Sequence, residues 1–228
     1  MQGPETIDWA RAVMRQGHHK AAARELEKLV LNYPDREFSD EAQFLLGQAH
    51  TALKEYILAE NAFRLLLSSY PGSAFRVEAE LGIALCYVRQ APKHQLDQSA
   101  TKSAVRALER FVEDHPGSPL IPTALAELRN CRERLALKLL DAGVFYLGRG
   151  RIASAKIYLE EVRDDYPDTR SSLEARYHLA RCMEKEGDYA RAALGYSTLL
   201  SELEDEDPLR EKLADSLASV RKKLEPDK

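Results

Sequence analysis

A pattern of residues that recurs five times along the chain constrains its fold more than any other feature. Each copy has an alanine five positions after its first residue and large, mainly apolar residues nine and twelve positions after it. A proline follows at position seventeen in four copies, and Glu204 takes its place in the fifth. The copies start at Gly17, Lys54, Ser99, Gly150 and Gly187. Repeats of this length predict an array of similar structural units.

A second pattern lies upstream of each copy, where a small residue is followed three positions later by a large one. The five pairs are Ala10/Val13, Gly47/His50, Ala84/Tyr87, Gly143/Tyr146 and Ala180/Met183. A small residue on one helix lets the alanine-bearing next helix approach closely, and the apolar residues fill the groove beside the contact. The proline then ends the second helix. This is the tetratricopeptide pattern, and it predicts an all-α, right-handed superhelix of five helix hairpins plus a C-terminal capping helix.

The composition agrees with a helical protein. The chain has 30 Ala and 33 Leu, whereas Val, Ile and Thr total 21, and β-branched residues lose more rotamer freedom in helices. The 33 basic residues face 37 acidic ones without a basic block, so nucleic-acid binding is not indicated. Three widely spaced cysteines favour neither disulfides nor a zinc site, and we expect them to be buried. The sequence has no apolar run long enough to span a membrane.

The spacing predicts the positions of the helices. The expected pairs are 5–16 with 19–32, 39–53 with 56–69, 74–90 with 98–114, 120–148 with 151–164, and 170–186 with 189–203, followed by a cap at 207–224. Two features depart from regular repeats: eight extra residues between the helices of the third hairpin, within 90–98, and a fourth first helix about four turns longer than the others. A long helix there would divide the chain into 5–118, with repeats one to three, and 119–224, with repeats four and five and the cap.

These two departures carry a resemblance to a known family. The inserted loop from Gln90 to Gln98, the segment from Arg134 to Gly150, and the motif Asp165-Tyr166-Pro167-Asp168-Thr169 resemble the BamD family. Its members are lipoproteins of the machinery that assembles β-barrels in the outer membrane. The resemblance extends over about residues 8–203, and outside these segments any tetratricopeptide protein would match.

The resemblance implies a periplasmic, lipid-anchored adaptor without catalytic activity. In the family, the first three repeats form a pocket proposed to receive extended ends of unfolded barrel substrates. The last two repeats dock on the periplasmic domain nearest the barrel of the central assembly protein. Two departures stand out: the sequence shows neither a signal peptide nor a lipid-acceptor cysteine, and Tyr158 stands about where some members carry a docking arginine.

Candidate binding residues follow from the expectation that the first helices of such a superhelix line its concave face. For the substrate segment we expect Arg11, Arg15, Phe44, Gln48, Leu81, Leu85 and Arg89. Apolar members would contact alternate aromatic side chains, while polar ones would pair with carbonyls or a terminal carboxylate. For the assembly partner we expect Tyr146, Arg149, Arg151, Tyr158 and Arg163, since aromatic and arginine residues are enriched at interface hot spots. The alternative for both sets is ordinary packing and surface charge.

No motif in the sequence indicates an enzyme. Phosphate-binding glycine loops and the common hydrolase and metalloprotease motifs are missing, and we expect no cofactor and no metal. Gly148-Arg149-Gly150 is predicted to be a hairpin turn with a glycine helix cap. The function we expect is therefore a protein-interaction scaffold of outer-membrane assembly. Two alternatives are a periplasmic adaptor that coordinates envelope constriction with cell-wall synthesis, and a cytoplasmic scaffold or chaperone cofactor.

Overall fold

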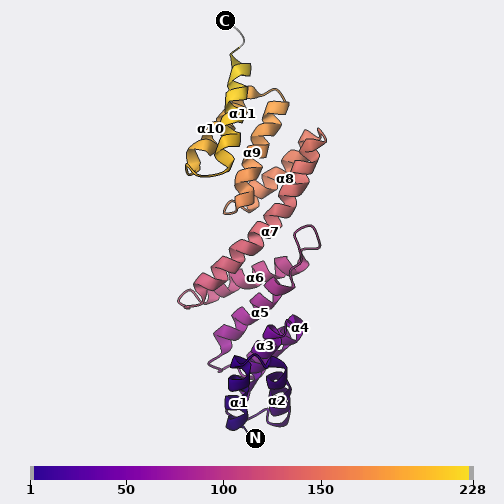
Figure 1. Ribbon diagram of the computed structural model, residues 1–228, viewed down its shortest axis with the longest axis vertical. Coiled ribbons are helices and arrows are strands. Elements are labelled where there is room, and N and C mark those ends of the chain that lie inside the picture. Colours follow the sequence, from indigo (N-terminus) through magenta and orange to yellow (C-terminus); the bar gives the residue numbers. More distant parts are fainter. Residues whose placement is uncertain (1–2, 226–228) are drawn as a thin grey trace. The chain divides into compact units, whose positions relative to one another are not determined.

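A computed structural model describes residues 3–225, which form eleven α-helices and no strand (Figure 1). The helices are α1 (Pro4–Arg15), α2 (His19–Asn32), α3 (Ser39–Ala52), α4 (Tyr56–Ser69), α5 (Arg76–Gln90), α6 (Ser99–Asp114), α7 (Ile121–Gly148), α8 (Ile152–Asp165), α9 (Arg170–Lys185), α10 (Tyr189–Glu202) and α11 (Leu209–Leu224). Every predicted boundary lies within two residues of the observed one. The tetratricopeptide prediction, with five hairpins and a final helix, is confirmed.

A left-handed backbone residue closes the turn of four hairpins. Gly17, Gly150 and Gly187 have φ angles of 85°, 73° and 83°, and Lys54 has a φ of 62°. Each is followed by a residue whose N–H donates back across the turn, as from Arg151 to the Tyr146 carbonyl at 3.0 Å. These are Schellman caps. In four repeat copies, the first residue of the pattern is therefore the residue with left-handed backbone conformation. The third copy begins at the first residue of α6, because the inserted loop precedes it.

Small residues sit where the two helices of a hairpin cross. A Cβ atom on Gly47 would lie 2.4 Å from the ring of Phe63, and one on Gly143 would lie 2.7 Å from Leu159. The alanine five positions into each copy has no exposed surface. The five alanines are Ala22, Ala59, Ala104, Ala155 and Ala192. Close approach thus explains both small-residue patterns in the sequence.

The chain divides into two compact units, one ending at Cys131 and the other starting at Arg132, within α7. In the first unit, each helix packs on the next, and α1 also contacts α3 as α3 contacts α5. The first helices of the three hairpins therefore form one layer. The inserted loop is fixed by the buried Gln98 side chain, whose Nε2 donates to the carbonyls of Lys93 and Leu96 at 2.9 and 3.2 Å.

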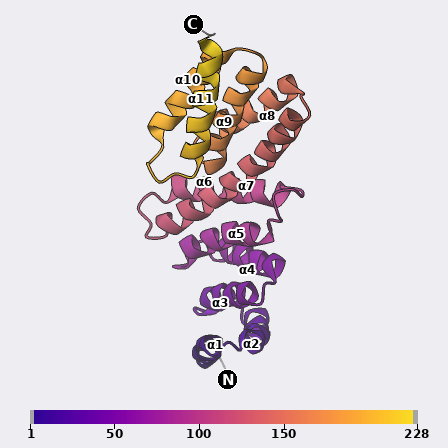
Figure 2. The same cartoon turned by 45° about the horizontal axis from the view of Figure 1, so that its top comes forward.

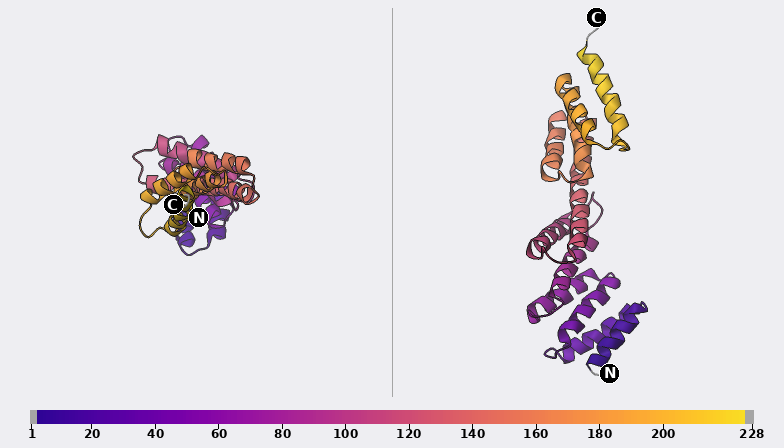
Figure 3. Two further views of the ribbon diagram at one scale, coloured as in Figure 1. Left: turned by 90° about the horizontal axis from the view of Figure 1, so that it is seen from above. Right: turned by 90° about the vertical axis from the view of Figure 1, so that its left-hand side faces the viewer.

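In the second unit, α8, α9, α10 and α11 pack in chain order (Figure 2). The start of α9 is held by α7, since the Glu133 carboxylate accepts from the backbone N–H of Arg170 at 2.7 Å and from the Ser171 hydroxyl at 2.6 Å. The last helix, yellow in Figure 3, contacts α10 and also α9. It therefore takes the position of a first helix in a sixth hairpin, and its Leu213, Leu217 and Val220 join Tyr196 and Leu199 of α10 in one core cluster.

The structure also describes the surroundings of the cysteines and the start of the last helix. All three cysteines are buried, as expected. Asp207 accepts a hydrogen bond from the Leu209 N–H at 2.8 Å and so caps the start of α11, a role common for an aspartate that precedes a first-turn proline. None of the helices in residues 3–225 is long and apolar enough to cross a bilayer.

Candidate protein-interaction surfaces

An apolar cavity of about 370 Å³ lies between α3 and α5 in the first unit. It contains four of the seven residues predicted to bind the substrate segment, namely Phe44, Gln48, Leu81 and Leu85. The other lining residues are Thr51, Ala52, Phe63, Glu78, Gly82 and Leu120. Its surface is almost entirely apolar, so it would accept an apolar side chain.

The expectation that Phe44 and Leu81 are exposed is wrong. They are only 9% and 4% exposed. The Phe44 ring stacks on Phe75 with centroids 4.8 Å apart and lies 5.9 Å from Phe63. The two residues therefore form the floor of the cavity, while Leu85 is half-buried and Gln48 is exposed at its edge.

A second cavity, of about 680 Å³, lies between α1 and α3. Its lining residues are Asp8, Arg11, Met14, Arg15, His19, Leu45 and Gln48. Arg11 is paired with Glu41 and lies 3.6 Å from Asp8. Arg15 is exposed and makes no ion pair with any residue in the described part of the chain. Gln48 lines both cavities, so the cationic and apolar parts adjoin, and we call Arg11, Arg15, Phe44, Gln48, Leu81 and Leu85 the inner groove.

Arg89 lies outside both cavities. Its guanidinium is 3.2 Å from the Glu127 carboxylate of α7, so it forms an exposed ion pair rather than part of the inner groove. The sequence analysis missed Thr51, Glu78 and Leu120 among the lining residues. A signal for the groove was nevertheless present, because Arg11, Gln48 and Leu85 each directly follow the small residue of their helix.

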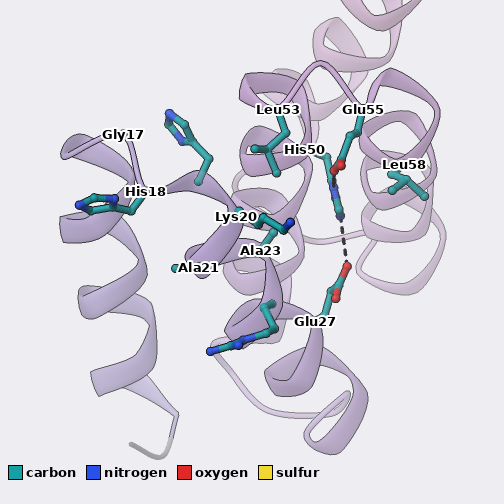
Figure 4. A pocket seen from close by; sticks show the side chains of 12 residues that line it. Gly17, His18, Lys20, Ala21, Ala23, Glu27, His50, Leu53, Glu55 and Leu58 are labelled. Carbon is teal, nitrogen blue, oxygen red and sulfur yellow. Dashed lines mark hydrogen bonds and ion pairs between the residues drawn. The ribbon is translucent and has the colours of Figure 1, made fainter.

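A third cavity, of about 780 Å³, lies at the turn ends of the first two hairpins (Figure 4). The buried His50 lies between two carboxylates there, with Nδ1 2.7 Å from Glu55 and Nε2 3.5 Å from Glu27. These contacts join α2, α3 and the turn before α4, so His50 links the first two hairpins. Within residues 3–225 no group of three or more His, Cys, Asp or Glu side chains could hold a metal ion.

Aromatic and arginine side chains lie at the α7–α8 turn, in the region that carries four of the five residues expected to dock the partner. Tyr146 and Tyr158 stack with centroids 5.5 Å apart and an interplanar angle of 6°. Phe145, which the sequence analysis missed, packs edge-on against Tyr146 and is 54% exposed. The Arg149 guanidinium lies 4.6 Å from the Phe145 ring centroid. We call Phe145, Tyr146, Arg149, Arg151 and Tyr158 the aromatic–arginine cluster.

Arg163 does not belong to this cluster. It lies near the far end of α8, about 18 Å along the helix from Arg151, and pairs with Asp164 at 2.7 Å. That hydrogen bond raises the pKa of the Arg163 guanidinium and lowers the pKa of the Asp164 carboxyl. Both groups are exposed, so the pair contributes little to stability.

Comparison with known proteins assigns the chain to a family. The sequence model of the family described as YfiO, outer membrane lipoprotein, matches residues 6–201. The chain belongs to this family. The predicted resemblance to BamD is thereby confirmed. Proteins of this family are non-catalytic scaffolds, which confirms the prediction that the chain is not an enzyme.

Two curated relatives are named outer membrane protein assembly factor BamD. The protein of Caulobacter vibrioides is 27% identical over 198 residues, which are 85% of this chain and 60% of the relative. That of Rickettsia prowazekii is 24% identical over 184 residues, 78% of this chain and 73% of the relative. The chain thus spans less than two thirds of the Caulobacter protein. Among solved structures, a TPR repeats protein from Bacteroides fragilis is 13% identical, with a TM-score of 0.48 and coverage of 95% and 96% of the two chains.

Proposed function

We propose that this chain is a non-catalytic scaffold in the assembly of outer-membrane proteins, acting at the periplasmic face of that membrane. Its inner groove would hold an extended segment of an unfolded barrel protein, and its aromatic–arginine cluster would bind the periplasmic domains of the central assembly protein. Membership of the family supports the general role, as do the two relatives named as assembly factors.

The position of Gln48 carries the proposal for the inner groove. Because Gln48 lines both cavities, one extended segment could place an apolar side chain over Phe44 and Leu81 and a terminal carboxylate near Arg11 and Arg15. Neighbouring side chains of an extended peptide point in opposite directions, so alternate aromatic residues would face the groove. The Gln48 amide would form a hydrogen bond with a backbone group of the segment, between its apolar side chain and its terminal carboxylate.

The aromatic–arginine cluster suits a protein interface. Phe145 and Arg149 are exposed, and a stacked aromatic pair presents a rigid surface that loses little entropy on binding. Tyr158 occupies about the place where some family members carry a docking arginine. In this chain Tyr158 is stacked on Tyr146, so Arg149 and Arg151 would supply the charged contacts instead.

Peptide binding measured by fluorescence anisotropy tests the inner groove. The probe is an extended peptide of about twelve residues with alternate aromatic residues and a free terminal carboxylate. We expect Leu85→Glu and Gln48→Ala to weaken peptide binding about tenfold or more. Amidation of the peptide's terminal carboxylate should weaken binding to the wild type but should not weaken binding to Arg15→Glu, which lacks the cation that pairs with it. The control is Ile57→Glu, at a position on α4 that is 66% exposed and outside the groove. Binding that Leu85→Glu and Gln48→Ala leave unchanged, with helicity intact, would rule out the inner groove as the binding site.

A further inference from the structure

We propose that the second unit carries another binding site, a pocket between α9 and α11 that takes an acidic side chain of a partner protein. The pocket has a volume of about 360 Å³. Its lining residues are Arg170, Glu174, Tyr177, His178, Arg181, Pro208, Leu209 and Lys212. All of them belong to the second unit, so this site does not depend on the inner groove or on the aromatic–arginine cluster.

The pocket occupies the same place in the repeat as the inner groove. Arg181 directly follows the small residue Ala180, just as Arg11 follows Ala10 and Gln48 follows Gly47. Helix α11 contacts α9 as α3 contacts α1, which leaves a groove between neighbouring first helices. Such grooves are the binding surfaces of repeat arrays. The second unit therefore has its own groove of this kind, with cationic rather than apolar walls.

On the side of the pocket formed by Arg181 and Lys212, no carboxylate of the described residues pairs with the positive charges. Arg181 and Lys212 make no ion pair with any residue between 3 and 225, although the Arg181 guanidinium lies 5.9 Å from the Tyr177 ring. His178 is half-buried, and its Nδ1 has no hydrogen-bond partner among the described residues. Burial, together with the charges of Arg181 and Lys212, lowers the pKa of His178 to about 4. An anion placed between these groups would reduce the repulsion among their positive charges and would accept a hydrogen bond from the His178 ring.

The other walls favour a carboxylate over a phosphate group. Arg170 is already engaged by the Asp207 carboxylate, at 2.5 and 2.9 Å, and lies 4.0 Å from Glu174. A dianion would be repelled by these two carboxylates, whereas a single carboxylate matches the remaining cations. Tyr177, Pro208 and Leu209 offer apolar surface to the methylene stem of an acidic side chain.

Three of the five carboxylates in the neighbouring acidic segment, residues 202–207, form ion pairs away from Arg181 and Lys212. Glu202 pairs with Arg176 at 2.6 Å, and Asp205 with Arg210 at 3.3 Å. Asp207 pairs with Arg170 and also caps α11. These contacts lower the pKa values of the Glu202 and Asp207 carboxyls. The open cations of the pocket are therefore left for a carboxylate from another protein.

Binding of a fluorescent acidic peptide to the full chain tests this site. The probe is a peptide of about ten residues that alternates Glu and Leu, with a Gln-for-Glu peptide for comparison. We expect the acidic peptide alone to bind, and Arg181→Gln and Lys212→Gln each to weaken it about fivefold or more. The matched control is Lys222→Gln, on the exposed last turn of the same helix, which should not change the affinity.

A second readout follows the His178 ring by NMR. A carboxylate in the pocket favours the protonated imidazole, so saturating peptide should raise the pKa of His178. The proposal is overturned if the peptide fails to bind at about 1 mM or if the two pocket variants bind it as the wild type does. It is also overturned if inorganic phosphate shifts the His178 resonance while the peptide does not, since the site would then select phosphate.

Discussion

At the residue scale, the left-handed turn position separates Lys54 from its counterparts in the other hairpins. Gly17, Gly150 and Gly187 adopt positive φ without steric cost, whereas the Cβ of Lys54 opposes this conformation by about 1–2 kcal/mol. Lys54→Gly should therefore raise the free energy of unfolding, by about 0.5–1 kcal/mol after the greater chain entropy of glycine is included. Urea denaturation followed by circular dichroism measures the change. The reverse change, Gly17→Lys, should destabilise by a similar amount, and a loss of stability in Lys54→Gly would contradict the account.

His178 gives the second unit a pH-dependent stability. The pKa of His178 is lowered from its ordinary value of 6.5 to about 4 by burial and by Arg181 and Lys212. The unfolded chain then binds a proton more readily than the folded one, so this contribution is present above pH 6.5 and is lost as the pH falls toward 4. After allowance for partial exposure, about 2 kcal/mol should be lost. His178→Gln should flatten the dependence of urea stability between pH 7 and pH 4.5, and an unchanged slope would contradict the assignment.

At the scale of helices, close crossings within a hairpin determine which positions tolerate a side chain. The ring of Phe63 is wedged between Gly47 and Gly82, to which added Cβ atoms would come within 2.4 and 2.8 Å. Gly47→Val should therefore destabilise the first unit by about 3 kcal/mol or more. Gly117→Ala is the matched control, since nothing lies within 4 Å of an added Cβ there, and it should change stability by less than about 0.5 kcal/mol. Thermal melts that show equal effects for the two variants would count against the packing argument.

The sequence could predict the hairpins because their signals are local: all five carry a small crossing residue, four carry a left-handed turn residue, and four carry a terminal proline. The candidate sites were less predictable, because burial depends on neighbours from other repeats. Phe44 is buried by Phe63 of the next helix and by Phe75 before α5, and no local pattern reveals that. Arg163 has the residue type of a docking contact, but the helix places it a long way from the α7–α8 turn. The pocket with His178 was missed because its second wall comes from the capping helix.

At the scale of the whole molecule, the chain combines surfaces of different chemistry on a single repeated scaffold. The first unit presents the inner groove, with apolar and cationic parts that meet at Gln48. The second unit presents the aromatic–arginine cluster and, on separate helices, the cationic pocket of α9 and α11. Repeats that conserve their packing positions leave the exposed positions of each helix free to differ. This freedom lets one fold contact more than one protein, as the proposed scaffold function requires.

The central claim is tested most directly by the affinity of this chain for the periplasmic domains of the barrel-assembly protein from the same organism. Biolayer interferometry at two salt concentrations should show saturable binding that Arg149→Glu and Arg151→Glu weaken about tenfold or more. Arg163→Glu is the matched control, since Arg163 lies outside the cluster, and it should bind within about twofold of the wild type. No binding at about 50 µM by a folded, helical wild-type chain, or equal weakening by all three variants, would contradict the account.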